Sequence, residues 1–66
     1  MDVTKEIKKV MIEEDVNIVG LAERLNTSQP NISGKFKRNN YTIKDLESIA
    51  KALNRNLEIN FIKIEE

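Results

Sequence analysis

Amide and hydroxyl side chains gather in the segment 28–34, whose sequence is SQPNISG. These groups donate and accept hydrogen bonds, but they are weak nucleophiles unless a neighbouring base activates them. The chain positions suggest no such base for Ser28, Ser33 or Ser48. The chain also has no His and no Cys, which excludes zinc-finger sites, thiol catalysis and imidazole acid–base chemistry. We therefore expect recognition through hydrogen bonds, without enzymatic activity, a metal site or a cofactor.

Basic residues surround this polar segment. The whole chain carries 11 Lys+Arg and 11 Asp+Glu, yet residues 24–44 contain no acid. The basic residues within that range are Arg24, Lys35, Lys37, Arg38 and Lys44. Such segregation predicts one positive face, although the net charge of the whole chain is zero. A face of this kind is typical of surfaces that bind phosphates. The alternative interpretation is an ordinary solvated surface.

The length of 66 residues predicts one small domain with a marginal core. Without disulfides or metal, its stability must come from well-packed helices or from a partner chain. The longest apolar run, 18–22, has five residues and is too short to cross a membrane. The segment 1–10 is charged throughout and has no apolar part typical of an export signal. We expect a cytoplasmic protein without membrane contact.

The spacing of apolar residues predicts four helices, at about 3–14, 18–25, 28–38 and 42–53. Their expected N-caps are Asp2, Asn17, Ser28 and Thr42, the last forming a capping box with Asp45. Asn26 is expected to adopt a left-handed conformation in the turn before the third helix. The expected core residues are Val3, Ile7, Val10, Met11, Leu21, Ala22, Leu25, Ile32, Phe36, Ile43, Leu46, Ile49, Ala50 and Leu53.

The end of the chain changes period. Apolar residues at 57, 59 and 61 alternate with polar ones, which is strand spacing, and two more follow at 62 and 64. Since a lone strand is unstable in water, we predict that a strand at about 57–64 pairs antiparallel with its copy across a two-fold axis. The predicted dimer interface comprises Leu57, Ile59, Phe61, Ile62 and Ile64. The alternative is an extended tail in which residues 57–61 pack on the helices.

The sequence predicts two short helices joined by a tight polar turn, and the second helix begins with SQPNIS. This is the layout of a helix-turn-helix. The sequence LAERLNTSQPNISGKFKRNNYTIKDLESIAKALN resembles the phage repressor/Cro class of helix-turn-helix domains, the xenobiotic-response-element (XRE) family. The matching features are Leu21-Ala22, Ser28-Gln29, Ile32 and the segment IAKAL. The resemblance covers about residues 7–54. It implies that residues 1–66 form a single, mainly α, four-helix lambda-repressor-like domain, with the helix-turn-helix at about 18–37.

Three positions depart from the usual family pattern. Asn26 replaces the commoner turn Gly, and Ile18 stands where relatives often have a Gln that contacts the DNA backbone. Lys35 replaces an aliphatic residue, so its ammonium must reach solvent or a phosphate while Phe36 packs inward.

The resemblance implies a sequence-specific transcriptional regulator of the Cro/C1 type, most often a repressor, that binds a near-palindromic operator as a homodimer. The third helix would enter the major groove of double-stranded DNA. The predicted base-contacting residues are Ser28, Gln29, Pro30, Asn31, Ser33 and Gly34. The predicted phosphate-contacting residues are Asn17, Lys35, Lys37, Arg38, Asn39, Asn40 and Lys44. Tyr41 is expected either to donate to a phosphate or to cover the core.

The alternative from another class is a protein-interaction module, an antitoxin-like or anti-repressor domain that uses the same fold. The acid-free segment and Gln29 favour DNA, whereas the acidic flanks and zero net charge are compatible with a protein partner. The sequence does not identify such a partner, whether toxin or anti-repressor.

Overall fold

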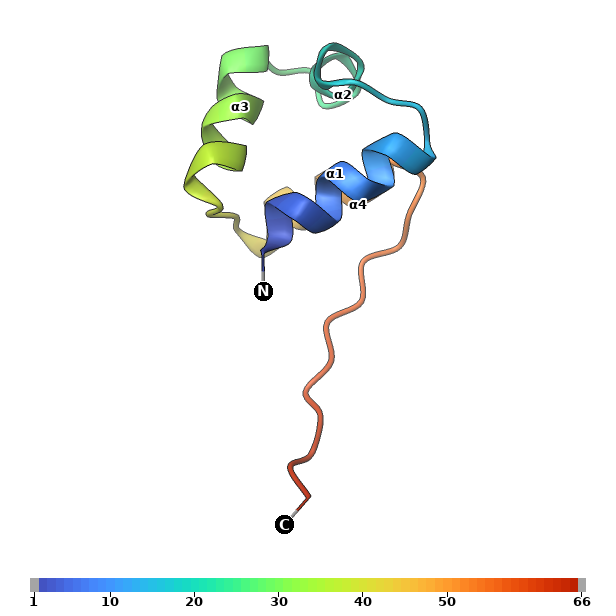
Figure 1. Ribbon diagram of the computed structural model, residues 1–66, viewed down its shortest axis with the longest axis vertical. Coiled ribbons are helices and arrows are strands. Elements are labelled where there is room, and N and C mark those ends of the chain that lie inside the picture. Colours follow the sequence, from blue (N-terminus) through green and yellow to red (C-terminus); the bar gives the residue numbers. More distant parts are fainter. Residues whose placement is uncertain (1, 66) are drawn as a thin grey trace.

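The computed structural model describes residues 2–65 and contains four helices, as predicted. They are α1 (Val3–Glu13), α2 (Ile18–Arg24), α3 (Gln29–Arg38) and α4 (Ile43–Ala52). Helix α2 packs against α3 and α4. In Figure 1 α4 lies behind α1, and residues of both helices line a groove. None of the helices within residues 2–65 has the length and apolar character needed to cross a bilayer.

All four predicted N-caps form, since each cap side chain accepts a hydrogen bond from the backbone N–H three residues later. The cap residues are Asp2, Asn17, Ser28 and Thr42. The predicted capping box also forms, because Asp45 Oδ2 accepts from the Thr42 N–H at 2.9 Å. Local sequence therefore determines where each helix begins.

The helices end on left-handed Asp or Asn residues instead of Gly. Asp15, Asn26, Asn39 and Asn54 have φ of 54°, 55°, 50° and 59°, a region that Asn and Asp tolerate better than other non-Gly residues. After α1, α2 and α4 the following N–H reaches back to the helix, as from Arg55 to the Ala50 carbonyl at 2.8 Å. The predicted left-handed conformation of Asn26 is confirmed.

The core lies where the helices meet, and Leu21, Ile32 and Leu53 are its most buried side chains. Most predicted core residues are buried or partly buried there. Ile43 is an error of prediction, because its side chain is 60% exposed. It lies six residues before Ile49, about 120° away around the helix axis, and so falls at the edge of the buried stripe. Val16, which was not predicted, is buried after the left-handed turn at Asp15.

Thr4 is the one polar residue buried among residues 2–65, and it joins α1 to the end of α3. Its hydroxyl oxygen lies 3.0 Å from the Phe36 carbonyl oxygen and 3.1 Å from Asn39 Oδ1, and it also hydrogen-bonds the Tyr41 hydroxyl. The Thr4 N–H donates to Asn39 Oδ1 at 3.1 Å, which satisfies a first-turn donor of α1. We call Thr4, Phe36, Asn39 and Tyr41 the Thr4 cluster. It confirms that Tyr41 covers the core.

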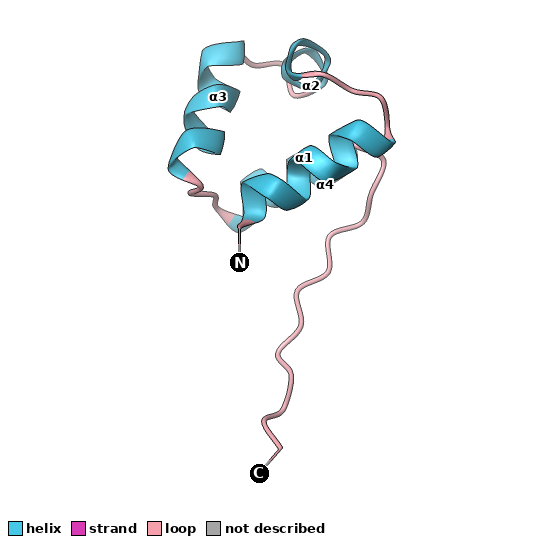
Figure 2. Cartoon of the chain, in the orientation of Figure 1, coloured by secondary structure: helices cyan, strands magenta, loops and turns pink. Residues whose placement is uncertain are grey.

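After the turn at Asn54 the chain forms an extended tail, residues 55–65 (Figure 2). No strand occurs within residues 2–65, so the predicted strand at 57–64 is not observed. Only the start of the segment 57–61 stays beside the helices, because Leu57 is 36% exposed and lines a groove between α1 and α4. The alternative of a packed tail fails beyond residue 58, since Ile59 is 53% and Phe61 100% exposed. The physical reason is that a strand needs a hydrogen-bonding neighbour, and residues 2–65 contain no second extended segment to provide one.

The left-handed helix ends generate a first prediction. Replacing Asn54 with Gly removes backbone strain without loss of a side-chain hydrogen bond, and we expect equal or higher stability. Replacing Asn39 with Gly removes the same strain but leaves the buried Thr4 N–H unpaired, and we expect a loss of about 1–3 kcal/mol. Urea unfolding of both variants measures the difference. Equal stability of the two would contradict a positioning role for the Asn39 side chain.

Candidate nucleic-acid interface

Helix α3 presents a polar outer face because its inner face is anchored in the core. Ile32 is 2% exposed and belongs to the same buried cluster as Leu21 of α2. Since helical side chains repeat every 3.6 residues, burying Ile32 turns Pro30, Gly34 and Lys37 away from the core. Among the predicted base-contacting residues, Gly34 is half-buried and the others are exposed: Ser28, Gln29, Pro30, Asn31 and Ser33.

Local hydrogen bonds order the first turn of α3. Ser28 Oγ accepts from the Asn31 N–H at 3.3 Å, and Asn31 Nδ2 donates to Thr27 Oγ1 at 2.8 Å. The amide of Gln29 makes no hydrogen bond within residues 2–65. Gln29 therefore projects an uncommitted donor and acceptor from an ordered helix start.

Gly34 is half-buried because the Arg38 side chain, one turn later, lies over it. A Cβ at Gly34 would lie 3.0 Å from Arg38 Nη1, so the guanidinium occupies the space above the missing side chain. The covering atoms are the end of a long flexible side chain. Another molecule can therefore approach the α3 backbone here if Arg38 changes rotamer.

Three of the predicted phosphate-contacting cations remain available at the surface. Lys37, Arg38 and Lys44 are exposed and form no ion pair within residues 2–65. All lie in the last turn of α3 or the first turn of α4. The structure therefore places positive charge beside the polar face of α3.

Other predicted phosphate contacts already have partners inside the protein. Lys35 Nζ pairs with Asp45 Oδ1 at 2.7 Å, and each side chain is 25% exposed. Asn39 Oδ1 belongs to the Thr4 cluster, and Asn17 Oδ1 caps α2 through the Gly20 N–H at 2.8 Å. Asn40 is exposed in the loop after α3. The structure thus divides the predicted set into side chains that face solvent and side chains that position helices.

Arg24, also part of the acid-free segment, has a structural contact. Its Nη1 donates to the Ala52 carbonyl at 2.8 Å and so connects α2 to the last turn of α4. An arginine at a helix C-terminus satisfies a carbonyl that has no partner within the helix.

Lys8 of α1 is a cation near this surface that sequence reasoning missed. Its Nζ lies 5.7 Å from the centroid of the Phe36 ring, a cation–π distance. Lys8 also lines a hollow of about 340 Å³ together with Ser33 and Lys37 of α3. No local pattern in the sequence signals this proximity, because it depends on how α1 packs against α3.

Asp45 directly follows the acid-free segment, and Lys35 neutralises it. The hydrogen bond from the Lys35 ammonium is the main cause that lowers the pKa of Asp45 below its ordinary value of 3.8, and the Thr42 N–H adds to the effect. The carboxylate therefore stays ionised at neutral pH within a pair that cancels its charge.

A metal site and a likeness to known proteins would each be further evidence of function. Within residues 2–65 no cluster of acidic, His or Cys side chains is arranged to hold a metal ion. No protein-family model, curated protein or solved structure matches the chain.

The Lys35–Asp45 pair generates a pH prediction. Because the folded pKa of Asp45 is lowered, its contribution to stability is present above pH 3.8 and is lost as the pH falls through the lowered folded pKa. Asp45→Asn keeps an acceptor for the capping box but removes this titration. We expect the unfolding free energy to fall less steeply as the pH drops below about 3.8, measured by urea unfolding.

The matched control is Glu47→Gln, which removes an exposed acid from the same helix that forms no ion pair within residues 2–65. If both substitutions reduced the acid-induced fall of the unfolding free energy equally, the Lys35–Asp45 pair would have no specific effect.

Proposed function

We propose that the protein is a sequence-specific DNA-binding transcriptional regulator, a cytoplasmic repressor of the XRE type. The observation that carries the proposal is the exposed N-terminal half of α3, which offers amide and hydroxyl groups beside unpaired cations. In this proposal α2 and α3, within about residues 18–37, are the helix-turn-helix, and α3 is the recognition helix.

The dimensions of α3 suit the major groove. A helix of 10 residues is about 15 Å long, and its diameter of roughly 10–12 Å matches a groove about 12 Å wide. Gln29 would pair its amide with adenine N6 and N7. Asn31 and Ser33 would hydrogen-bond base edges near it, and Ser28 and Pro30 would contact thymine methyl groups. Gly34 would allow the helix backbone to approach the DNA closely.

Cations around α3 would supply the affinity that does not depend on sequence. Lys37, Arg38 and Lys44 would contact phosphates on one side, with Asn40 beside them and Asn17 at the start of α2. The position of Lys8 over Phe36 supports adding α1 to this phosphate surface. The ion pair with Asp45 favours a positioning role for Lys35 over a phosphate contact.

A homodimer would present two α3 helices to two half-sites of a near-palindromic operator, about 34 Å apart. The apolar tail supports this part of the proposal, because Leu57, Ile59, Phe61, Ile62 and Ile64 are all exposed in the single chain. A second copy would provide the partner that a strand requires.

A protein-interaction module, antitoxin-like or anti-repressor, is the second candidate. The same exposed apolar tail favours it, because such a surface also suits a different protein. Binding to duplex DNA with a steep salt dependence supports the regulator, whereas salt-insensitive binding to a protein supports the second candidate.

Two substitutions separate base recognition from phosphate contact. Gln29→Ala should lose about 1–3 kcal/mol on the best DNA site and relax the preference at one base pair. Lys37→Ala should weaken all sequences similarly and lower the slope of log affinity against log salt by about one. Fluorescence anisotropy on specific and random duplexes measures both. Equal losses for Gln29→Ala on the two duplexes would reject its role in base recognition.

Gly34→Ala should raise the stability of the protein and lower its affinity for DNA. Ala favours the helix by about 0.5–1 kcal/mol over Gly, and the flexible Arg38 end can move from the added methyl. The same methyl would hold α3 away from the DNA, so affinity should fall while thermal stability rises. Gly20→Ala in α2 is the control, since its Cβ makes ordinary contacts of 3.4–3.5 Å. It should raise stability alone. Unchanged affinity for Gly34→Ala would contradict close approach at this position.

A further inference from the structure

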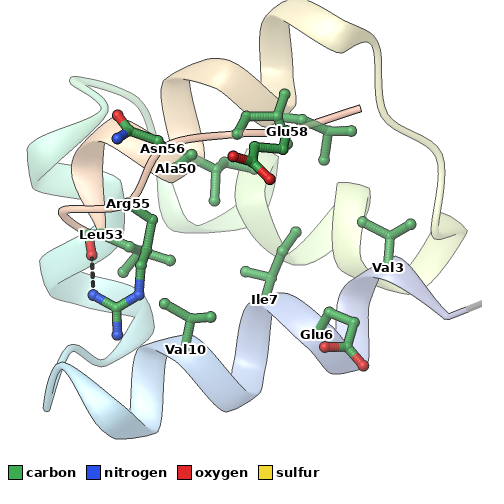
Figure 3. A pocket seen from close by; sticks show the side chains of 12 residues that line it. Val3, Glu6, Ile7, Val10, Ala50, Leu53, Arg55, Asn56 and Glu58 are labelled. Atoms are coloured by element: carbon green, nitrogen blue, oxygen red, sulfur yellow. Dashed lines mark hydrogen bonds between the residues drawn. The ribbon is translucent and has the colours of Figure 1, made fainter. Parts of the chain in front are cut away.

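An apolar groove runs between α1 and α4, and we call it the α1/α4 groove (Figure 3). It encloses about 420 Å³. The core residues Ile7 and Leu53 line it, together with Val10 of α1 and Ala50 of α4. Most lining residues are apolar, and the charged ones are Glu6, Arg55 and Glu58. An apolar cleft with few charged residues is the usual form of a docking surface for an apolar segment.

The tail begins at this groove and then leaves it. Leu57 and Glu58 still line the groove, but the exposed fraction rises to 100% at Phe61 and stays at 82% for Ile64. Arg55 fixes this point of departure, since its guanidinium pairs with Glu14 at 3.3 Å and Glu13 at 3.5 Å. The tail therefore borders the apolar groove only with residues 55–58, and the exposed apolar segment 59–64 lies outside it.

The apolar pattern of the tail requires cover on both sides. In an extended chain Ile59 and Phe61 point to one side, whereas Ile62 and Ile64 point to the other. A two-stranded ribbon with one side in water would alternate apolar and polar residues throughout. Pairing of two tails alone satisfies their backbone groups but leaves apolar side chains in water. A further apolar surface must cover them.

The exposed area is large enough for a dimer. A compact protein of 7.6 kDa exposes roughly 4,300 Å², whereas this chain exposes 5517 Å². The excess of about 1,200 Å² exceeds the roughly 800 Å² that each partner buries in a standard interface. The radius of gyration of 12.9 Å also exceeds the value of about 11 Å for a compact chain of this length.

The tail is also long enough to reach a second molecule. Residues 57–64 span about 26 Å when extended, whereas α1 with its 11 residues is about 16 Å long. The segment can therefore cross to a partner and still lie along the whole groove.

We propose that the α1/α4 groove binds residues 59–64 of a second copy of this chain, with Phe61 as the main anchor. The exchange is reciprocal, so each protomer provides one tail and one groove. This inference rests on the homodimer of the proposed function and adds the surface that covers its tails.

Disulfide cross-linking tests the proposal directly. The chain has no Cys, so each variant carries a single thiol. A Val10→Cys protein is mixed with a Phe61→Cys protein of different tag length and oxidised without DNA. We expect a mixed disulfide between the two proteins as the main product. Ile12→Cys is the control on the same helix, because Ile12 is 80% exposed and does not line the groove.

Three results would overturn the exchange. In the first, Ile12→Cys cross-links to Phe61→Cys as well as Val10→Cys does. In the second, Phe61→Cys cross-links only to itself. In the third, a protein that carries both Val10→Cys and Phe61→Cys forms a disulfide within one chain at high dilution. The second result indicates paired tails away from the groove. The third indicates that the tail covers its own groove.

Sedimentation equilibrium adds a test without thiols. Val10→Glu places a charge in the groove and should weaken dimerisation at least tenfold, whereas Ile12→Glu should leave it unchanged. Circular dichroism confirms that both variants are folded. Unchanged dimerisation of a folded Val10→Glu protein would contradict the proposal.

DNA binding distinguishes this inference from the proposed function. A protein that is monomeric without DNA yet binds a specific duplex overturns the exchange and leaves the proposed function intact. A cross-linked dimer with no affinity for any duplex supports the exchange and overturns the proposed function.

Discussion

The position of α3 relative to α1 depends on the hydrogen bonds of the buried Thr4 hydroxyl. It joins the second residue of α1 to the Phe36 carbonyl, to Asn39 and to Tyr41, and so connects both ends of the loop after α3 to the start of the chain. An unpaired polar group in this position would cost about 1–3 kcal/mol, a large fraction of the stability of a small domain. The Thr4 cluster therefore holds the C-terminal end of α3 against α1. Ile32 holds the middle of the same helix in the core.

The attachment of α3 to α1 and the core also explains why polar residues in the segment 35–45 have two different roles. Side chains that point toward α1 or α4 are used for positioning, as Asn39 is in the Thr4 cluster and Lys35 in its pair with Asp45. Side chains that form no ion pair within residues 2–65, such as Lys37 and Arg38, keep their charge exposed. A rigid inner side and a charged outer side are what a recognition helix requires, since it must reach its ligand without bending.

Local features were predictable from the sequence, and tertiary ones were not. The four helices, their N-caps and the left-handed Asn26 depend on neighbouring residues, and these were correctly predicted. The pairing of Thr4 with Asn39 joins positions 35 residues apart, so no local pattern reveals it. The proximity of Lys8 to Phe36 is hidden for the same reason. The strand at 57–64 was predicted from its period alone, but the described part of the chain, 2–65, offers no second strand to pair with it.

The central claim is that the exposed face of α3 reads a DNA sequence as part of a symmetric dimer. Selection of bound duplexes from a random library, followed by sequencing, tests it most directly. The account predicts enrichment of an inverted repeat whose half-sites are separated by about one helical turn of DNA. Recovery of unenriched sequences, with weak binding that disappears as salt is raised, would contradict it.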